Sequence, residues 1–252
     1  MMYRLLTAAV LAASSVSAVS ISSACQSALT GVAANSDANA CLSVSSLLST
    51  VLDSNASIIT PVDNMLKALC SAAPCSNATL SAVVTNITTG CSAELSSSGS
   101  SVSAAEITTL VEQYYTTARS IICLTDSGTN CITETLTNIQ SMLGTLSLDN
   151  IGTIITNAFT STSSLPANVS CSNCVKGAYN ILNQNFPSTA SSIASELDSE
   201  CGANFTDGSA PSGIVESATS TGGKDSGAMA VTRGALAGSV LLVASYLWVF
   251  LA

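Results

Sequence analysis

Residues 103–124 read SAAEITTLVEQYYTTARSIICL, and this stretch decides the fold class. Ser103 followed three positions later by Glu106 is a capping box, in which each side chain satisfies a free backbone N–H at the start of a helix. Apolar residues then recur at the three- and four-residue spacing of one helix face: Ile107, Leu110, Val111, Tyr114, Ala118, Ile121 and Ile122. The stretch therefore predicts a long amphipathic helix.

The flanking sequence repeats this pattern on both sides. Thr60 is the expected N-cap of a helix with Pro61 in its first position, and Gly90 and Gly144 are expected to end two others. Apolar stripes predict further helices over residues 60–69, 80–90, 132–143, 148–159, 175–182 and 188–198. No alternating run is long enough to predict a sheet. We expect an all-α fold, a small disulfide-stapled helical domain followed by a disordered Ser/Gly-rich stalk.

The composition excludes several classes of function. The 252-residue chain has 8% charged residues, a net charge of −9 and no His. An acidic chain lacks the basic surface that nucleic-acid phosphates require. The absence of His rules out Ser-His-Asp and Cys-His nucleophile systems and His-ligated metal sites. We therefore expect no nucleic-acid partner and no cofactor.

The first residues are typical of a secretory signal peptide. Arg4 supplies a positive charge, residues 5–13 are apolar, and residues 16–18 are small enough for cleavage. The apolar segment is too short to cross a bilayer about 30 Å thick. We expect residues 1–18 to be removed, which places the chain in an oxidising, extracellular compartment. A buried N-terminal helix is the alternative interpretation.

Residues 226–252 have the pattern of a GPI-attachment signal. Small residues and a short polar spacer precede an uncharged stretch over residues 235–252. We expect residues 226–252 to be removed and a glycolipid to be attached at one of four positions: Asp225 or Ser226 first, then Gly223 or Ser220. A retained tail helix is the competing interpretation.

Two segments lie between these signals. Residues 19–206 contain all of the cysteines and the helical stripes, so they form the expected Cys-rich helical domain. Residues 207–225 are mostly small and polar and have no apolar stripe. Such a segment buries too little surface to offset its chain entropy, so it is expected to be a flexible Ser/Thr/Gly stalk.

An even number of cysteines in a secreted chain predicts up to five disulfides. The ten participants are Cys25, Cys41, Cys70, Cys75, Cys91, Cys123, Cys131, Cys171, Cys174 and Cys201. The sequence leaves the pairing open. A Gly-containing turn favours Cys123 with Cys131 first, and Cys25 with Cys41 is the second expected pair.

Five N-x-S/T sequons mark asparagines that can carry N-linked glycans in a secreted protein. They begin at Asn55, Asn77, Asn86, Asn168 and Asn204. We expect at least three of them to be used, and each one predicts that its residue lies at the surface.

Residues 171–174 read CSNC, which is a C-x-x-C motif. Because the compartment is oxidising, structural disulfides are favoured over thiol exchange or zinc binding.

The chain resembles fungal secreted, Cys-rich, GPI-anchored cell-surface proteins that carry a helical domain of unknown function. The features that carry the resemblance are the CSNC motif, the A-x-x-I/L helix that follows it to residue 182, the terminal Cys201, the stalk and the GPI tail. The resemblance covers residues 25–201. It implies a plasma-membrane or cell-wall location, with no established activity and no catalytic residues.

These observations favour a non-catalytic, GPI-anchored cell-surface or cell-wall glycoprotein. Its expected partner is the outer leaflet of the plasma membrane, with cell-wall polysaccharide as a second candidate. The alternative is an extracellular lipid- or sterol-binding helical module, because elicitin-like sterol carriers are also small, helical and disulfide-rich. Tyr114 and Tyr115 are the residues that would line its pocket.

An enzyme is not expected. The only candidate chemistry is a carboxylate pair of the kind that glycosidases use. The candidate pairs are Glu106 with Glu112 and Glu196 with Glu200. Solvated helix faces are the favoured interpretation of both pairs, because the domain has few aromatic residues on which a sugar could stack.

Overall fold

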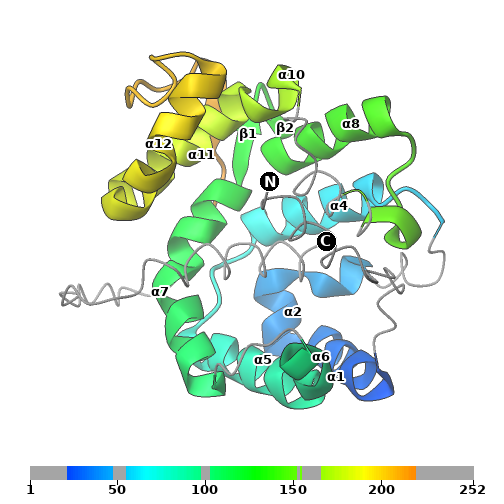
Figure 1. Ribbon diagram of the computed structural model, residues 1–252. Helices are drawn as coiled ribbons and strands as arrows, with labels where there is room; N and C mark the ends of the chain where they lie inside the picture. The colour runs from blue at the N-terminus through cyan, green and yellow to red at the C-terminus, as the bar shows by residue number, and fades with distance from the viewer. Residues whose placement is uncertain (1–21, 48–54, 98–102, 152–153, 155–165, 220–252) are drawn as a thin grey trace, which may run out of the picture.

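A computed structural model describes residues 22–47, 55–97, 103–151, 154 and 166–219 (Figure 1). These residues are mostly helical, which confirms the predicted fold class. The helices are α1 (Ser23–Ala34), α2 (Ser36–Leu42), the 3-10 helix η1 (Val44–Leu47), α4 (Ile59–Ser71), α5 (Asn77–Gly90), α6 (Ser92–Ser97), α7 (Ala104–Ile122), α8 (Cys131–Leu143), α10 (Ala167–Ser170), α11 (Asn173–Asn185) and α12 (Pro187–Cys201). Residues 148–151 are also helical. The expected signal peptide and the expected GPI signal lie outside the described residues, as do residues 152–153 and 155–159 of the helix predicted over residues 148–159.

The long helix predicted over residues 103–124 is α7. Its capping box is present: the backbone N–H of Glu106 donates to Ser103 Oγ, and the backbone N–H of Ser103 donates to Glu106 Oε2 at 2.8 Å. Nineteen residues make a helix about 28 Å long. Figure 1 shows α7 along one side of the molecule, joining the group formed by α1, α2, α5 and α6 to the group that contains α11 and α12.

The start of α4 differs from the prediction. Ile58, not Thr60, occupies the N-cap position, and its side chain makes no capping hydrogen bond. Instead, the backbone N–H of Ile58 donates to the Leu146 carbonyl at 2.9 Å, and the Ile58 side chain is buried. Tertiary packing therefore sets this helix start, which puts Thr60 and Pro61 inside the first turn. The expected ends of α5 and α8, at Gly90 and Gly144, are confirmed.

The core is divided into several small clusters. The largest packs α4 against α8 and the loop that follows α8, and its buried members are Ile58, Val62, Met65, Leu66, Leu146 and Ile151. Each of four others contains both cysteines of one disulfide beside one buried apolar residue. Disulfides thus occupy positions that large aromatic side chains fill in other domains, which fits a chain with 4% aromatic residues.

A three-stranded antiparallel sheet was not predicted. Its strands are β1 (Leu124–Asp126), β2 (Thr129–Asn130) and β3 (Ile214–Glu216), in the order β2-β1-β3. Ser127 and Gly128 both have positive φ, as a tight hairpin between β1 and β2 requires. Strands of two or three residues are too short to show an alternating pattern, so the sequence carries no signal for them.

The boundary expected after residue 206 is also wrong, because residues 207–219 fold back onto the domain. This C-terminal strap contains β3, which pairs with β1, and its Thr219 N–H donates to the Cys70 carbonyl at 2.9 Å. At its other end Asp207 accepts from Lys176 Nζ at 2.8 Å. Hydrogen bonds from Lys176 and Ser209 hold the pKa of Asp207 at about 2. The strap is held by backbone hydrogen bonds and by polar side chains that would also suit a stalk, so its small, polar composition did not reveal it.

Candidate functional site

All ten cysteines are paired, as expected, but neither favoured pairing is present. The disulfides are Cys25–Cys91, Cys41–Cys75, Cys70–Cys123, Cys131–Cys174 and Cys171–Cys201. The predicted Cys123–Cys131 bond is wrong, because Cys123 caps the end of α7 and bonds to Cys70 of α4, whereas Cys131 begins α8 and bonds to Cys174 of α11.

The disulfides divide the chain into two cross-linked halves. Three of them lie within residues 25–123 and two within residues 131–201, and none joins one half to the other. The two cysteines of the C-x-x-C have different partners, so they do not form a dithiol pair. Contacts between the halves include the β1–β2 hairpin, the packing of α11 on α7 and the C-terminal strap.

The asparagines of all five sequons are exposed. Asn77 is the first residue of α5 and Asn86 lies in the same helix, while Asn168 lies in α10. Asn55 and Asn204 lie in turns. Every predicted glycosylation site is therefore at the surface of the folded domain. The expected GPI-attachment residues Asp225 and Ser226 lie outside the described residues.

The carboxylate pairs considered for catalysis do not converge on a cleft. Glu106 is occupied by the capping box, where hydrogen bonds from Ser103 hold its pKa below the usual value. Glu112 lies on α7 six residues further along. Glu196 and Glu200 are both exposed on α12.

The two tyrosines considered as pocket residues belong to the packing of α7. Tyr114 contacts the ring of Phe186, with 4.4 Å between the ring centroids. Tyr115 packs against the cluster around Cys41, Cys75 and Leu80, and its hydroxyl accepts from the Cys75 N–H at 2.8 Å. Both side chains are partly buried and connect α7 to neighbouring segments.

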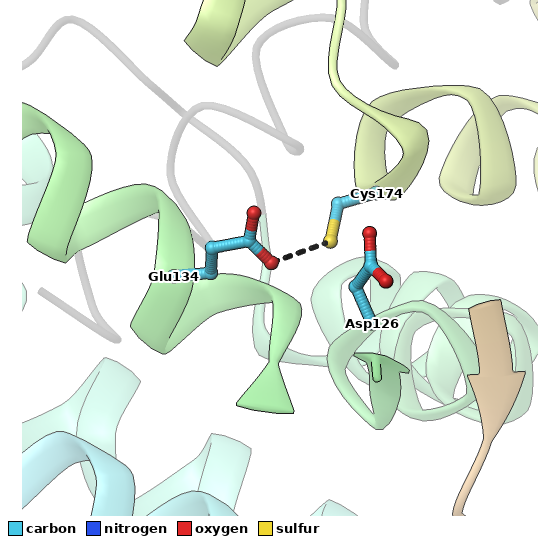
Figure 2. Close-up of side chains that lie close together, drawn as sticks. All are labelled: Asp126, Glu134 and Cys174. Carbon is cyan, nitrogen blue, oxygen red and sulfur yellow. Dashed lines mark hydrogen bonds between the residues drawn. The ribbon is translucent and has the colours of Figure 1, made fainter. Parts of the chain in front are cut away.

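A different acidic cluster lies where the β1–β2 hairpin meets α8 and α11, and sequence reasoning missed it. Asp126 at the end of β1 and Glu134 in the first turn of α8 converge on Cys174 of α11 (Figure 2). Their oxygen atoms and Cys174 Sγ lie within 4.8 Å of one another, and Glu134 Oε2 is 3.7 Å from the sulfur. Because Cys174 is bonded to Cys131, its sulfur has no proton to donate and is no thiolate. Two carboxylates fall short of the six to eight oxygen ligands that Ca²⁺ takes.

This cluster predicts a pH effect on stability. Burial, and then the nearby Asp126 charge, raise the pKa of Glu134. A raised pKa means that the folded protein binds this proton more tightly than the unfolded chain, so Glu134 lowers stability above its folded pKa and the loss disappears as the pH falls. Glu134→Gln should therefore raise the free energy of unfolding at pH 7, by less than about 1 kcal/mol at this partly exposed site.

Guanidinium unfolding of the oxidised protein at pH 7 and pH 3.5 measures this effect. At pH 3.5 the difference between Glu134→Gln and the parent protein should vanish. Glu196→Gln, at an exposed position on α12, is the matched control and should change neither value. A Glu134→Gln variant that is less stable at pH 7 would show that the carboxylate is held by an attractive contact instead.

A shallow groove lies between α1, α2 and α5. Its volume is about 220 Å³, and it is lined by Val32, Asn35, Asp37, Ser76, Ala78, Thr79, Ala82, Val83 and Asn86. Pockets that enclose small organic ligands measure roughly 300–1,000 Å³ and are mostly apolar. This groove is smaller, open to solvent and of mixed polarity, so it offers little support for a lipid or sterol carrier.

The fold and these sites define a disulfide-stapled helical domain with surface sequons. No family model, curated protein or solved structure matches the chain. Its function therefore has to be argued from its own residues. The five disulfides are consistent with an extracellular or secreted protein. Among the described residues, no helix is long and apolar enough to cross a membrane.

Proposed function

We propose that this chain is a non-catalytic, GPI-anchored glycoprotein of the cell surface or cell wall. The observation that carries the proposal is the coincidence of five disulfides with five exposed sequon asparagines in one domain. Oxidised cysteines and N-linked glycans both belong to the secretory pathway. The resemblance of the sequence to fungal Cys-rich surface proteins supports the same location.

The charge distribution favours a lipid anchor over direct binding of the protein surface to the membrane. The cations of the described residues are Lys67, Arg119 and Lys176. Lys67 pairs with Asp63 at 2.6 Å, Lys176 pairs with Asp207, and Arg119 is buried. The described surface therefore offers no basic patch for anionic headgroups or nucleic-acid phosphates. A GPI anchor would hold this acidic domain at the membrane although its described surface has no electrostatic attraction to anionic headgroups.

The C-terminal strap limits how far the domain could stand from the proposed anchor. Thr219 ends the strap, and Asp225 is six residues further along the chain. Six extended residues span about 20 Å at most. With the stalk shortened from the expected 207–225 to 220–225, the proposed anchor would hold the helical domain close to the membrane.

The test is release from intact cells by a phosphatidylinositol-specific phospholipase, followed by mass spectrometry. We expect release of the protein and a C-terminal peptide that ends at Asp225 or Ser226 with a glycolipid remnant. A variant with residues 235–252 deleted should appear in the medium instead of on the cells. A recovered peptide that reaches Ala252 would contradict the anchor. Lipid that co-purifies with the released protein in a fixed ratio would favour the carrier alternative.

A further inference from the structure

Asn86 differs from the other sequon asparagines in its surroundings. It lies in the interior of α5, and its side chain lines the groove between α1, α2 and α5. Opposite it, Gly31 of α1 has no side chain, and Asn86 Nδ2 lies 3.4 Å from the position that a Cβ on residue 31 would take. Nδ2 is the atom that an N-linked sugar modifies. A side chain on residue 31 would therefore touch the atom that the sugar modifies, and glycine at this position avoids that contact.

The groove extends away from Asn86 along one face of α5. Thr79, Ala82 and Val83 stand seven, four and three residues before Asn86, which is the spacing of neighbours on a helix surface. Across from them, the end of α1 and the start of α2 contribute Val32 and Asp37. The Cys25–Cys91 disulfide joins α1 to the end of α5, so the two walls of the groove are held together.

The lining suits a sugar better than it suits a lipid. A pyranose ring presents apolar C–H faces and polar edges of hydroxyl or acetamido groups. The groove offers both kinds of contact, with Val32 and Val83 as apolar groups and Asp37 and Thr79 as polar ones. Among the described residues, no hydrogen bond engages the Asn86 carboxamide, so its Nδ2 is available for modification.

We propose that the groove seats the innermost sugar residues of an N-linked glycan on Asn86. This glycan packs against α1, α2 and α5, whereas a glycan on Asn204, in a turn outside the groove, extends into solvent. The inference rests on the proposed function, because it requires passage through the secretory pathway. It adds that one glycan is part of the folded surface and covers the partly exposed apolar side chain of Val83.

The experiment compares glycan release at two sites in one molecule. The secreted, folded protein is treated with a peptide N-glycosidase, which converts each released Asn to Asp, and mass spectrometry follows the sites separately. We expect release at Asn86 to be about tenfold slower than at Asn204, since a packed segment must open before the enzyme reaches it. After denaturation the two rates should be equal.

Two variants show whether the groove causes the protection. Ala82→Gln places a larger side chain in the groove at an exposed helix position, and it should raise the release rate at Asn86 to that at Asn204. Thr85→Gln, exposed on the same helix but outside the groove, should leave the protection unchanged. Equal release rates in the parent protein, or an unmodified Asn86 beside occupied sequons, would overturn this inference and leave the proposed function standing. Absence of glycan from all five sequons would instead count against the proposed glycoprotein itself.

Discussion

Removal of the Cys70–Cys123 disulfide should lower the free energy of unfolding by about 4 kcal/mol. The bond closes a loop of 53 residues, for which the loss of chain entropy in the unfolded state predicts a value of that size. Both cysteines are buried, and Cys123 is fully inaccessible. The change is made as Cys70→Ala with Cys123→Ala and measured by guanidinium unfolding, with the other four disulfides oxidised.

A local effect on the C-terminal strap should distinguish the Cys70–Cys123 disulfide from the other disulfides. The carbonyls of Cys123 and Cys70 accept the backbone N–H groups of Ser217 and Thr219, so the disulfide positions the C-terminal strap. Amide exchange over β3 should therefore accelerate in the Cys70→Ala, Cys123→Ala protein. The control is Cys41→Ala with Cys75→Ala, which removes a 34-residue loop in another cluster. Loss of β3 protection in both proteins alike would show that the strap depends only on global stability.

Leu146→Ala should cost about 3 kcal/mol, the middle of the range for a buried leucine that leaves a cavity. Leu146 has no exposed surface and belongs to the core cluster that contains Met65 and Leu66. Its carbonyl also accepts the Ile58 N–H that starts α4. The loop after α8 therefore closes the largest core cluster, and truncation of its central side chain opens a space between α4 and α8.

The matched control is Leu148→Ala, two residues further along the chain, at the start of the helical turn over residues 148–151. Leu148 is 36% exposed, so its truncation should cost less than about 1 kcal/mol. Urea or guanidinium unfolding of both variants gives the comparison. Similar small losses for the two variants would contradict the assignment of Leu146 to the core.

The helical part of the fold could be predicted because its signals are local. The capping box at Ser103 and Glu106 and the apolar stripe after it mark α7 without any knowledge of its neighbours. Gly144 ends α8 for a local reason, because its positive φ suits a glycine at the C-cap, whereas Gly90 lies at the end of α5 where Ala28 of α1 packs against it. Ile58 shows the limit of this approach, because a backbone hydrogen bond to a loop 88 residues away replaces the side-chain cap that Thr60 seemed to offer.

The features that could not be predicted depend on contacts between distant segments. Cys123 and Cys131 are close in sequence, yet they bond to Cys70 and Cys174 in distant segments. The strap is held by hydrogen bonds to distant segments, which composition does not encode. Its β3 residue Ile214 packs beside Gly177, where a side chain on residue 177 would collide with it.

The candidate sites also fall into two groups, those marked by a local motif and those formed by contacts between distant segments. The sequon motif identifies five asparagines from sequence alone, and the structure places all five at the surface. The groove beside Asn86 forms only because α1 packs along α5, more than 40 residues later in the chain. The approach of Asp126 to Glu134 depends on a hairpin that was not predicted from the sequence.

The two halves of this domain are each cross-linked by their own disulfides, as expected of an extracellular protein. Proteolysis of the protein collected outside the cell under non-reducing conditions, with mass spectrometry of the linked peptides, tests this arrangement. We expect five pairs, Cys25–Cys91, Cys41–Cys75, Cys70–Cys123, Cys131–Cys174 and Cys171–Cys201, and no free thiol. A peptide linking Cys123 to Cys131, or free thiols at several of these positions, would contradict it.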